Sequence, residues 1–403
     1  MMTHDNLITE ALQAKAPEFT NEYRSYPALS LERASCLQFL ALEYRNNPEN
    51  AEIKTALLER IRFLISGGNE PYFNLGLNWS YPMIVNTITL LKDTALWSEF
   101  TPLEVDKINC LMKGFAYTLH YACDKDNNYE TGLRRNTHWG KRWAPNSHAN
   151  FLLYAKTICH YFGGREAFAK LFTSFDYDSY IADLERFGFT HALSTFTTPA
   201  IETEYGFRIP SAKEILEGTA ADQYFVSTQG DITNYLYGGS GQGIKREFLY
   251  SQRKPTPADG CDIVRGALHQ LYKNVCTSYI EFDGGVAKIA DGTISPEEGK
   301  KGMFYELNQN WRSGRSCMYH AMINFAVVVS CLITMKELGI LDITKRSDLA
   351  GFYELVKTGN NDLIYKLEHG YHSYNDGPDG IVYESNFTGY YFWKYVWQNY
   401  LSV

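Results

Sequence analysis

The sequence predicts an all-α-dominated fold, an αα-toroid or incomplete αα-barrel, that forms one domain over residues 1–403. Helical periodicity recurs along the chain, and long polar loops rich in Gly and Asn separate successive helix pairs. Only residues 279–290, which have an Asp-Gly-Gly turn at their centre, follow the pattern of a small β-hairpin. A succession of helix pairs with long loops favours a barrel whose loops form a groove at one end.

Each expected helix has its own local signal. Apolar residues at three- and four-residue spacing predict helices over residues 31–44 and 51–65, joined as a hairpin. Capping boxes at residues 101–104 and 211–214 mark two further helix starts, the first extending to about residue 122. Further amphipathic stretches cover residues 148–162, 178–187, 262–276, 316–338 and 348–357.

Composition narrows the possible ligands. A net charge of −8 gives no overall attraction for nucleic acid or for an anionic polymer, so a local basic cluster must hold any acidic ligand. The most apolar run, residues 325–335, is too short to span a bilayer and is typical of a core helix. The eight cysteines lack metal-site spacing and are expected to be buried fillers, and no cofactor is expected.

The first candidate constellation is a loop, residues 134–150, that runs into a helix. Cations bind carboxylates, Trp faces stack on pyranose rings, and Asn or His hydrogen-bonds a carboxylate or accepts a proton. Asn146 or Ser147 caps the helix, and the helix N-terminus lowers the pKa of a nearby His, which favours His148 as base before His138. The expected substrate-binding residues here are Arg135, Asn136, His138, Trp139, Arg142, Trp143 and Asn150.

The second constellation, residues 310–320, enters the apolar helix. Arg315 and Tyr319 are four residues apart and share one helix face, so the guanidinium favours the phenolate and makes Tyr319 a proton-transfer candidate. Arg312 and Trp311 precede them as further candidates for catalysis and substrate binding. The structural alternative is a tyrosine whose ring packs in the core while its hydroxyl finds a partner.

Two weaker patches complete the candidate site. Asn78 and Trp79 lie in an aromatic-amide loop before another helix, where stacking on a sugar and burial of the Trp are equally open. The Gly-rich residues 238–243 lack the Gly-Lys-Ser/Thr ending of a phosphate loop and are interpreted as a rim loop, with Lys245 and Arg246 as substrate contacts.

Together the Asn/His/Trp loop, the Arg-Ser-Gly-Arg-Ser-x-x-x-Tyr helix entrance and the helix pairs resemble toroidal polysaccharide lyases, most nearly polysaccharide lyase family 38. The resemblance extends from about residue 31 to the C-terminus. It implies an αα-toroid active on β-1,4-linked uronates such as glucuronan and mannuronate-rich alginate. It also implies an Asn/His pair, either Asn146 with His148 or Asn136 with His138, beside Tyr319 and either Arg312 or Arg315.

The implied reaction is syn β-elimination without a metal. Asn146 and an Arg neutralise the uronate carboxylate, which makes the C5 proton acidic enough to remove. Tyr319 takes this proton and protonates the departing O4, because H5 and O4 lie on the same side of glucuronate and mannuronate. His148 assists as base or as a second carboxylate contact.

Two other functions remain open. An inverting glycoside hydrolase on the same scaffold needs two carboxylates roughly 6.5–9.5 Å apart, and Glu202, Glu204 and Asp222 are the candidates. A noncatalytic protein that binds acidic polysaccharides would share the Trp and Arg groove. The resemblance suggests a periplasmic or secreted mature form, although no signal peptide is visible at the N-terminus of the chain.

Overall fold

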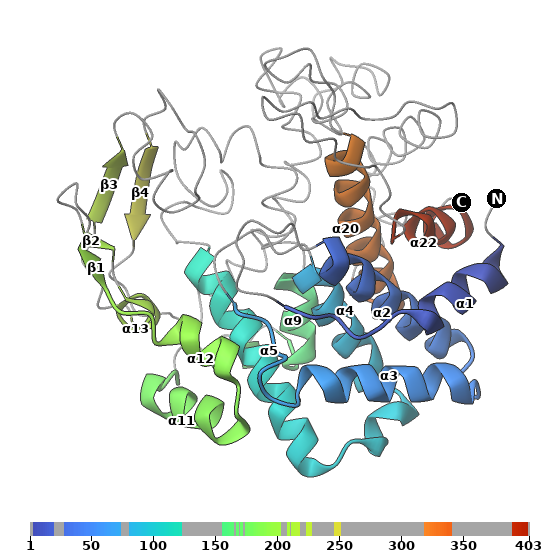
Figure 1. Cartoon of the computed structure of the whole chain (residues 1–403), viewed down its shortest axis with the longest axis horizontal. Coiled ribbons are helices and arrows are strands. Elements are labelled where there is room, and N and C mark those ends of the chain that lie inside the picture. The colour runs from blue at the N-terminus through green and yellow to red at the C-terminus, as the bar shows by residue number, and fades with distance from the viewer. Residues whose placement is uncertain are drawn as a thin grey trace.

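The computed structural model describes residues 3–19, 28–73, 80–122, 155–164, 167–168, 170–171, 174–202, 208–209, 211–217, 223–227, 246–250, 318–340 and 389–401, some of them by backbone alone. Helices dominate these residues, as predicted (Figure 1). The closure of the helices into a toroid stays a prediction.

The predicted N-terminal helical hairpin is confirmed. It consists of α2 (Ala28–Asn46) and α3 (Ala51–Leu64). The side chain of Asn50 caps α3 by accepting from the backbone N–H groups of Glu52 and Ile53, both at 3.1 Å. Gly67 then has a positive φ of 82°, which glycine adopts without strain, and the chain turns away from the helix at this residue.

The next helices confirm the first capping box. They are α4 (Ser80–Lys92), the 3₁₀ turn η1 (Ala95–Glu99) and α5 (Pro102–Ala122). The Thr101 N–H donates to Glu104 Oε2 at 2.8 Å, and the Glu104 N–H donates to Thr101 Oγ1 at 3.2 Å. These reciprocal bonds satisfy two N–H groups at the start of α5 that have no partner within the helix.

The apolar run forms a core helix, as predicted. It belongs to α20 (Met318–Glu337), whose side chains from Ala326 to Met335 are buried wherever they are described. α22 (Gly389–Val396), which continues into the π-helical turn η5 (Trp397–Leu401), packs against α20 and α2. Figure 1 places α22 beside α1 (His4–Gln13), so the first and last described helices are neighbours. Neither α1 nor α22 was predicted.

Three helices in the middle of the chain confirm predicted boundaries. α9 (Ala155–Tyr161) ends at Gly163 and Gly164, both with positive φ, and residues 148–154 of the predicted helix lie outside the described part. α11 (Tyr177–Phe187) ends at Gly188 in the left-handed conformation. The third, α13 (Ala212–Leu216), begins at the predicted capping box, where the Glu214 N–H donates to Ser211 Oγ at 3.2 Å and Glu214 Oε2 accepts from the Ser211 N–H at 2.7 Å.

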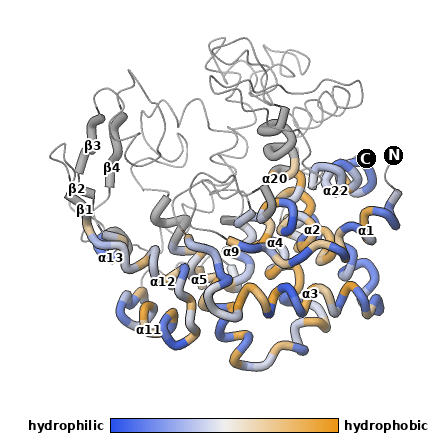
Figure 2. Tube along the Cα trace, in the orientation of Figure 1, coloured by the Kyte–Doolittle hydropathy of each residue, from blue (hydrophilic) through white to orange (hydrophobic). Residues whose placement is uncertain are grey.

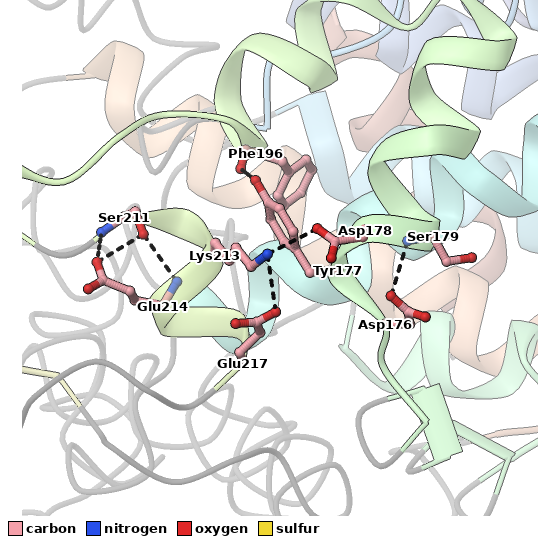
Figure 3. A network of polar contacts seen from close by, with 9 residues as sticks. All are labelled: Asp176, Tyr177, Asp178, Ser179, Phe196, Ser211, Lys213, Glu214 and Glu217. Carbon is pink, nitrogen blue, oxygen red and sulfur yellow. Dashed lines mark hydrogen bonds and ion pairs between the residues drawn. The ribbon is translucent and has the colours of Figure 1, made fainter.

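Polar contacts fasten α13 to α11, as Figure 3 shows. Lys213 Nζ lies 3.0 Å from Asp178 Oδ1, 3.8 Å from Glu217 Oε1 and 4.7 Å from the centroid of the Tyr177 ring. The Tyr177 hydroxyl donates to the carbonyl of Phe196 at 2.7 Å, which brings in the unpredicted helix α12 (Thr190–Phe196). These exposed ion pairs are structural contacts of small energy.

Strands occur in two short antiparallel pairs within the described residues, and sequence patterns did not predict them. The pairs are β1 (Ile201–Glu202) with β2 (Arg208–Ile209), and β3 (Gln223–Ser227) with β4 (Arg246–Tyr250). Two- and five-residue strands are too short for alternation to stand out. The predicted hairpin at residues 279–290 lies outside the described residues.

The core is one hydrophobic cluster, and Figure 2 shows hydrophobic stretches where α2, α4 and α20 meet. Four cysteines, Cys36, Cys110, Cys159 and Cys331, are buried and free, which confirms for these four the prediction of buried fillers. Burial raises the pKa of the Cys36, Cys110 and Cys331 thiols to about 12. Among the described helices, none is both long and apolar enough to cross a membrane.

Candidate functional site

Basic side chains join the C-terminal ends of four core helices. Arg45, in the last turn of α2, donates to the carbonyl of Leu90 in α4 at 2.7 Å and to that of Glu337 in α20 at 3.3 Å. Lys92, the last residue of α4, donates to the carbonyl of Tyr161, the last residue of α9. The final carbonyls of a helix lack partners within it, and cations satisfy them well.

A second set of buried contacts fixes the direction of three of these helices. Earlier in α2, Ser35 Oγ donates to Met83 Sδ at 3.0 Å, and Gln38 Nε2 donates to Thr334 Oγ1 at 2.8 Å. Asn86 Nδ2 donates to Cys331 Sγ at 3.6 Å, between α4 and α20. From these contacts to those of Arg45, the residue number rises in α2, in α4 (Met83 to Leu90) and in α20 (Thr334 to Glu337), so the three helices run parallel.

The N-terminal ends of the parallel helices therefore share one end of the molecule, here called the entrance end. The candidate constellations precede these ends in the sequence: Trp79 is followed directly by α4, and Arg315 stands three residues before the start of α20. The loop of residues 134–150 comes shortly before α9, whose last turn lies beside that of α4. Helix N-termini favour nearby negative charge, which suits an acidic ligand.

The side chains predicted for the site lie almost wholly outside the described residues. Tyr319 is the second residue of α20 and Arg246 the first of β4, and both are described by backbone alone. The others lie outside the described ranges, namely Asn78, Trp79, Arg135, Asn136, His138, Trp139, Arg142, Trp143, Asn146, His148, Asn150, Trp311, Arg312 and Arg315. Their roles stay predictions.

The side chains of the carboxylates proposed for the hydrolase alternative are not described either. Glu202 lies in β1, in register with Arg208 of β2, and its backbone alone is described. Glu204 and Asp222 fall outside the described residues. In the part of the chain that the structure describes, no group of three or more His, Cys, Asp or Glu side chains is placed to hold a metal ion.

A constellation that sequence reasoning missed lies at the entrance end. Glu70 is fully buried, and its Oε1 accepts from the backbone N–H groups of His191 at 2.6 Å and Ala192 at 3.1 Å, in the first turn of α12. The ring of Tyr72 stacks on that of His191 with centroids 4.0 Å apart and planes 12° apart. Both residues are partly exposed.

The proton on the His191 ring can be assigned from its partner. Nδ1 lies 2.8 Å from the carbonyl oxygen of Glu70. A carbonyl only accepts hydrogen bonds, so Nδ1 carries the proton and donates, which leaves Nε2 of the neutral ring as an acceptor. Backbone and side chain of Glu70 thus fix both the position and the tautomer of His191.

Phe73 anchors this constellation beside α4. Its ring packs against Phe115 at 4.9 Å and against Tyr81, the second residue of α4, at 6.1 Å between centroids. Gly114 makes room for it, because a Cβ there would stand 2.6 Å from the Phe73 ring. Phe73 itself has a φ of 52°, which is uncommon for a residue with a side chain. The Tyr72–His191 pair therefore lies beside the start of α4.

Comparison with known proteins relates most of the chain to a polysaccharide lyase. The chain is similar to a gellan lyase from Bacillus sp., with 23% identity over 380 residues, which are 92% of this chain and 14% of that relative. The chain thus spans a small fraction of the relative's length. No family model matches the chain, so membership of polysaccharide lyase family 38 stays a prediction. No solved structure matches it.

Proposed function

We propose that this chain is a polysaccharide lyase that cleaves β-1,4-linked uronate polymers by β-elimination. The observation that carries the proposal is the similarity to the Bacillus gellan lyase across 92% of the chain. A uronate has both the carboxylate and the C5 proton that an elimination needs. Glucuronan and mannuronate-rich alginate are the preferred substrate candidates, with gellan added by the comparison.

The parallel helices support this proposal on electrostatic grounds. α4 and α20 run parallel, so both begin toward the entrance end, and segments rich in Asn, Arg and Trp lead into them in the sequence. A carboxylate near these N-terminal ends would be favoured by the partial positive charge of the helices and by the guanidinium groups of Arg312 and Arg315. Neutralising the carboxylate is the requirement for acidifying H5.

We propose the following roles for the side chains. Asn146 and either Arg312 or Arg315 neutralise the carboxylate, with Asn136 as the alternative amide. Tyr319 removes H5 as its phenolate, the C4–O4 bond breaks as the C4–C5 double bond forms, and the same phenol returns its proton to O4. His148, or His138 in the other Asn-x-His triplet, assists as base or as a further contact to the carboxylate.

Ultraviolet absorbance tests the reaction, because elimination leaves a conjugated C4–C5 double bond. The panel consists of glucuronan, polymannuronate, gellan, polyguluronate and pectate, each with and without chelator. We expect absorbance to rise on the first three and to be insensitive to chelator. Release of reducing ends without absorbance would indicate the hydrolase, and binding without either signal would indicate a noncatalytic polysaccharide-binding protein.

A further inference from the structure

The Tyr72–His191 pair has the properties of a ligand contact rather than of a core pair. The ring of His191 covers one face of the Tyr72 ring, and both residues are partly exposed. Within the described residues, His191 Nε2 makes no hydrogen bond, although Nδ1 is firmly held by Glu70. A partly exposed tyrosine beside a ring nitrogen that makes no hydrogen bond among the described residues suits a sugar, which offers C–H groups on its face and hydroxyls at its rim.

A buried carboxylate, that of Glu70, lies behind the pair. The Glu70 carboxylate is buried and holds two backbone N–H groups of α12 through Oε1, while Oε2 has no hydrogen-bond partner. Burying a carboxylate with one oxygen unsatisfied costs free energy. Costs of this kind are retained at binding sites, where a buried group holds the contact residues in one geometry.

We infer that Tyr72 and His191 form a sugar-binding subsite of the entrance end, with Glu70 as the residue that positions them. Tyr72 stacks on a pyranose ring of the polysaccharide, and Nε2 of neutral His191 accepts a hydrogen bond from a hydroxyl of that ring. The inference rests on the proposed function for the identity of the ligand. The subsite would contribute to substrate binding and would take no part in the proton transfers.

Substitutions chosen for their geometry test the subsite. In His191→Asn the amide Nδ2 takes the place of the imidazole Nδ1, so the bond to the Glu70 carbonyl is kept while Nε2 is lost. Tyr72→Phe keeps the stacking ring and Tyr72→Ala removes it. We expect the KM for glucuronan to rise about tenfold in Tyr72→Ala and about fivefold in His191→Asn, with kcat within about twofold and little effect in Tyr72→Phe.

A second stacked His–Tyr pair provides the matched control. His4 and Tyr395 stack with centroids 4.9 Å apart and planes 19° apart, between α1 and α22. We expect Tyr395→Ala to leave KM unchanged. Glu70→Gln, which retains an oxygen for the backbone N–H groups, should resemble wild type, whereas Glu70→Ala should raise KM. Equal KM values for wild type, Tyr72→Ala and His191→Asn would overturn the subsite.

Direct binding separates failure of the subsite from failure of the proposed function. Isothermal titration of oligoglucuronate into wild type, Tyr72→Ala and Tyr395→Ala needs no turnover. A Kd about tenfold weaker for Tyr72→Ala alone supports the subsite even if no polymer is cleaved, a result that would overturn only the elimination. Equal Kd values would overturn the subsite and leave the lyase proposal standing, and a wild type that neither binds nor cleaves would overturn both.

Discussion

Two stacked His–Tyr pairs, each beside a buried glutamate, occupy different regions of the molecule and differ in what they leave open. At the α1–α22 contact, His4 Nε2 lies 3.0 Å from Glu43 Oε2, a close charge contact when the imidazole is protonated, though outside hydrogen-bond angles. At the entrance end, the Glu70 carboxylate accepts from backbone N–H groups of α12, and the Glu70 carbonyl accepts a hydrogen bond from Nδ1 of His191.

The difference lies in where the carboxylate is directed. Glu43 is directed at the ring nitrogen, so His4 serves to join α1 to α2 while its stacking on Tyr395 joins α1 to α22. Glu70 is directed at the backbone, so His191 is held firmly yet keeps one ring nitrogen for a ligand. The same three residue types therefore give a structural contact in one region and a candidate binding contact in the other.

The largest effect is expected on kcat, for a substitution of the tyrosine that we propose as the proton-transfer group. A substitution of a tyrosine on α22 is the control. Tyr319→Phe should lower kcat on the cleaved polymer by about 10³-fold, because the phenol carries both proton transfers. The stability of the protein should change little. Tyr391→Phe on α22, where the side chain is 47% exposed, is the control and should retain wild-type kcat. Retained turnover in Tyr319→Phe would remove this tyrosine from the mechanism.

A backbone substitution tests whether the entrance end depends on its scaffold. Gly67 has a φ of 82°, and a Cβ there would lie 2.8 Å from the carbonyl oxygen of Gly188. Gly67→Ala should lower the free energy of unfolding by about 3 kcal/mol, because strain and a backbone clash combine. It should also raise KM, since Glu70 follows three residues later.

Gly164→Ala is the matched control for this experiment. Gly164 also has a positive φ, 98°, but a Cβ there would meet nothing within 4 Å. It should therefore cost only about 1 kcal/mol, the strain alone, and leave KM unchanged. Urea denaturation and polymer kinetics measure both variants, and equal losses of stability would show that the contact with Gly188 is of no consequence.

Substitution in the His4–Tyr395 pair should change stability, whereas substitution in the Tyr72–His191 pair should change KM. His4→Ala leaves the Glu43 side chain, which is 8% exposed, without the imidazole beside it and should lower the free energy of unfolding by about 2 kcal/mol. Its kcat and KM should match wild type, whereas His191→Asn should change KM and not stability. If His4→Ala alters KM at unchanged stability, the contrast between the two pairs is wrong.

Local rules predicted the helices well, because their signals lie within a few residues of each other. The capping boxes at Thr101 and Ser211 formed as expected, and the glycines after α9 and α11 ended those helices with positive φ. The apolar run in α20 is buried because a helix that is apolar on every side has no face suited to water.

These local rules could not predict the Tyr72–His191 pair. Glu70 and His191 are separated by 121 positions, and no local pattern links a residue after Gly67-Gly68 to the first turn of a short helix. The strands β1 to β4 were missed because pairs of two and five residues carry too little alternation. The sequence indicates which side chains could transfer a proton or carry positive charge, because this depends on residue type. The partners that fix the geometry of these side chains depend on tertiary contacts, which local patterns do not show.

Alkaline pH provides the smallest and most selective test of the α1–α22 region. Burial raises the pKa of Tyr400 to about 12, and the nearby Glu43 adds to the effect. An unfolded tyrosine ionises near 10. Tyr400 therefore contributes stability that is fully present below pH 10 and is lost as the pH rises toward 12.

Tyr400→Phe removes this dependence at a cost near neutral pH of about 1 kcal/mol, because it loses a hydrogen bond with Tyr395. Urea midpoints at pH 7, 9, 10 and 11 should show wild type losing stability faster than Tyr400→Phe above pH 10, so that the two converge. Tyr391→Phe, changed at the exposed neighbour, should run parallel to wild type. Parallel curves for Tyr400→Phe would mean that the α1–α22 contact does not hold this hydroxyl in its neutral form, and the contrast with the open entrance pair would then rest on His4 alone.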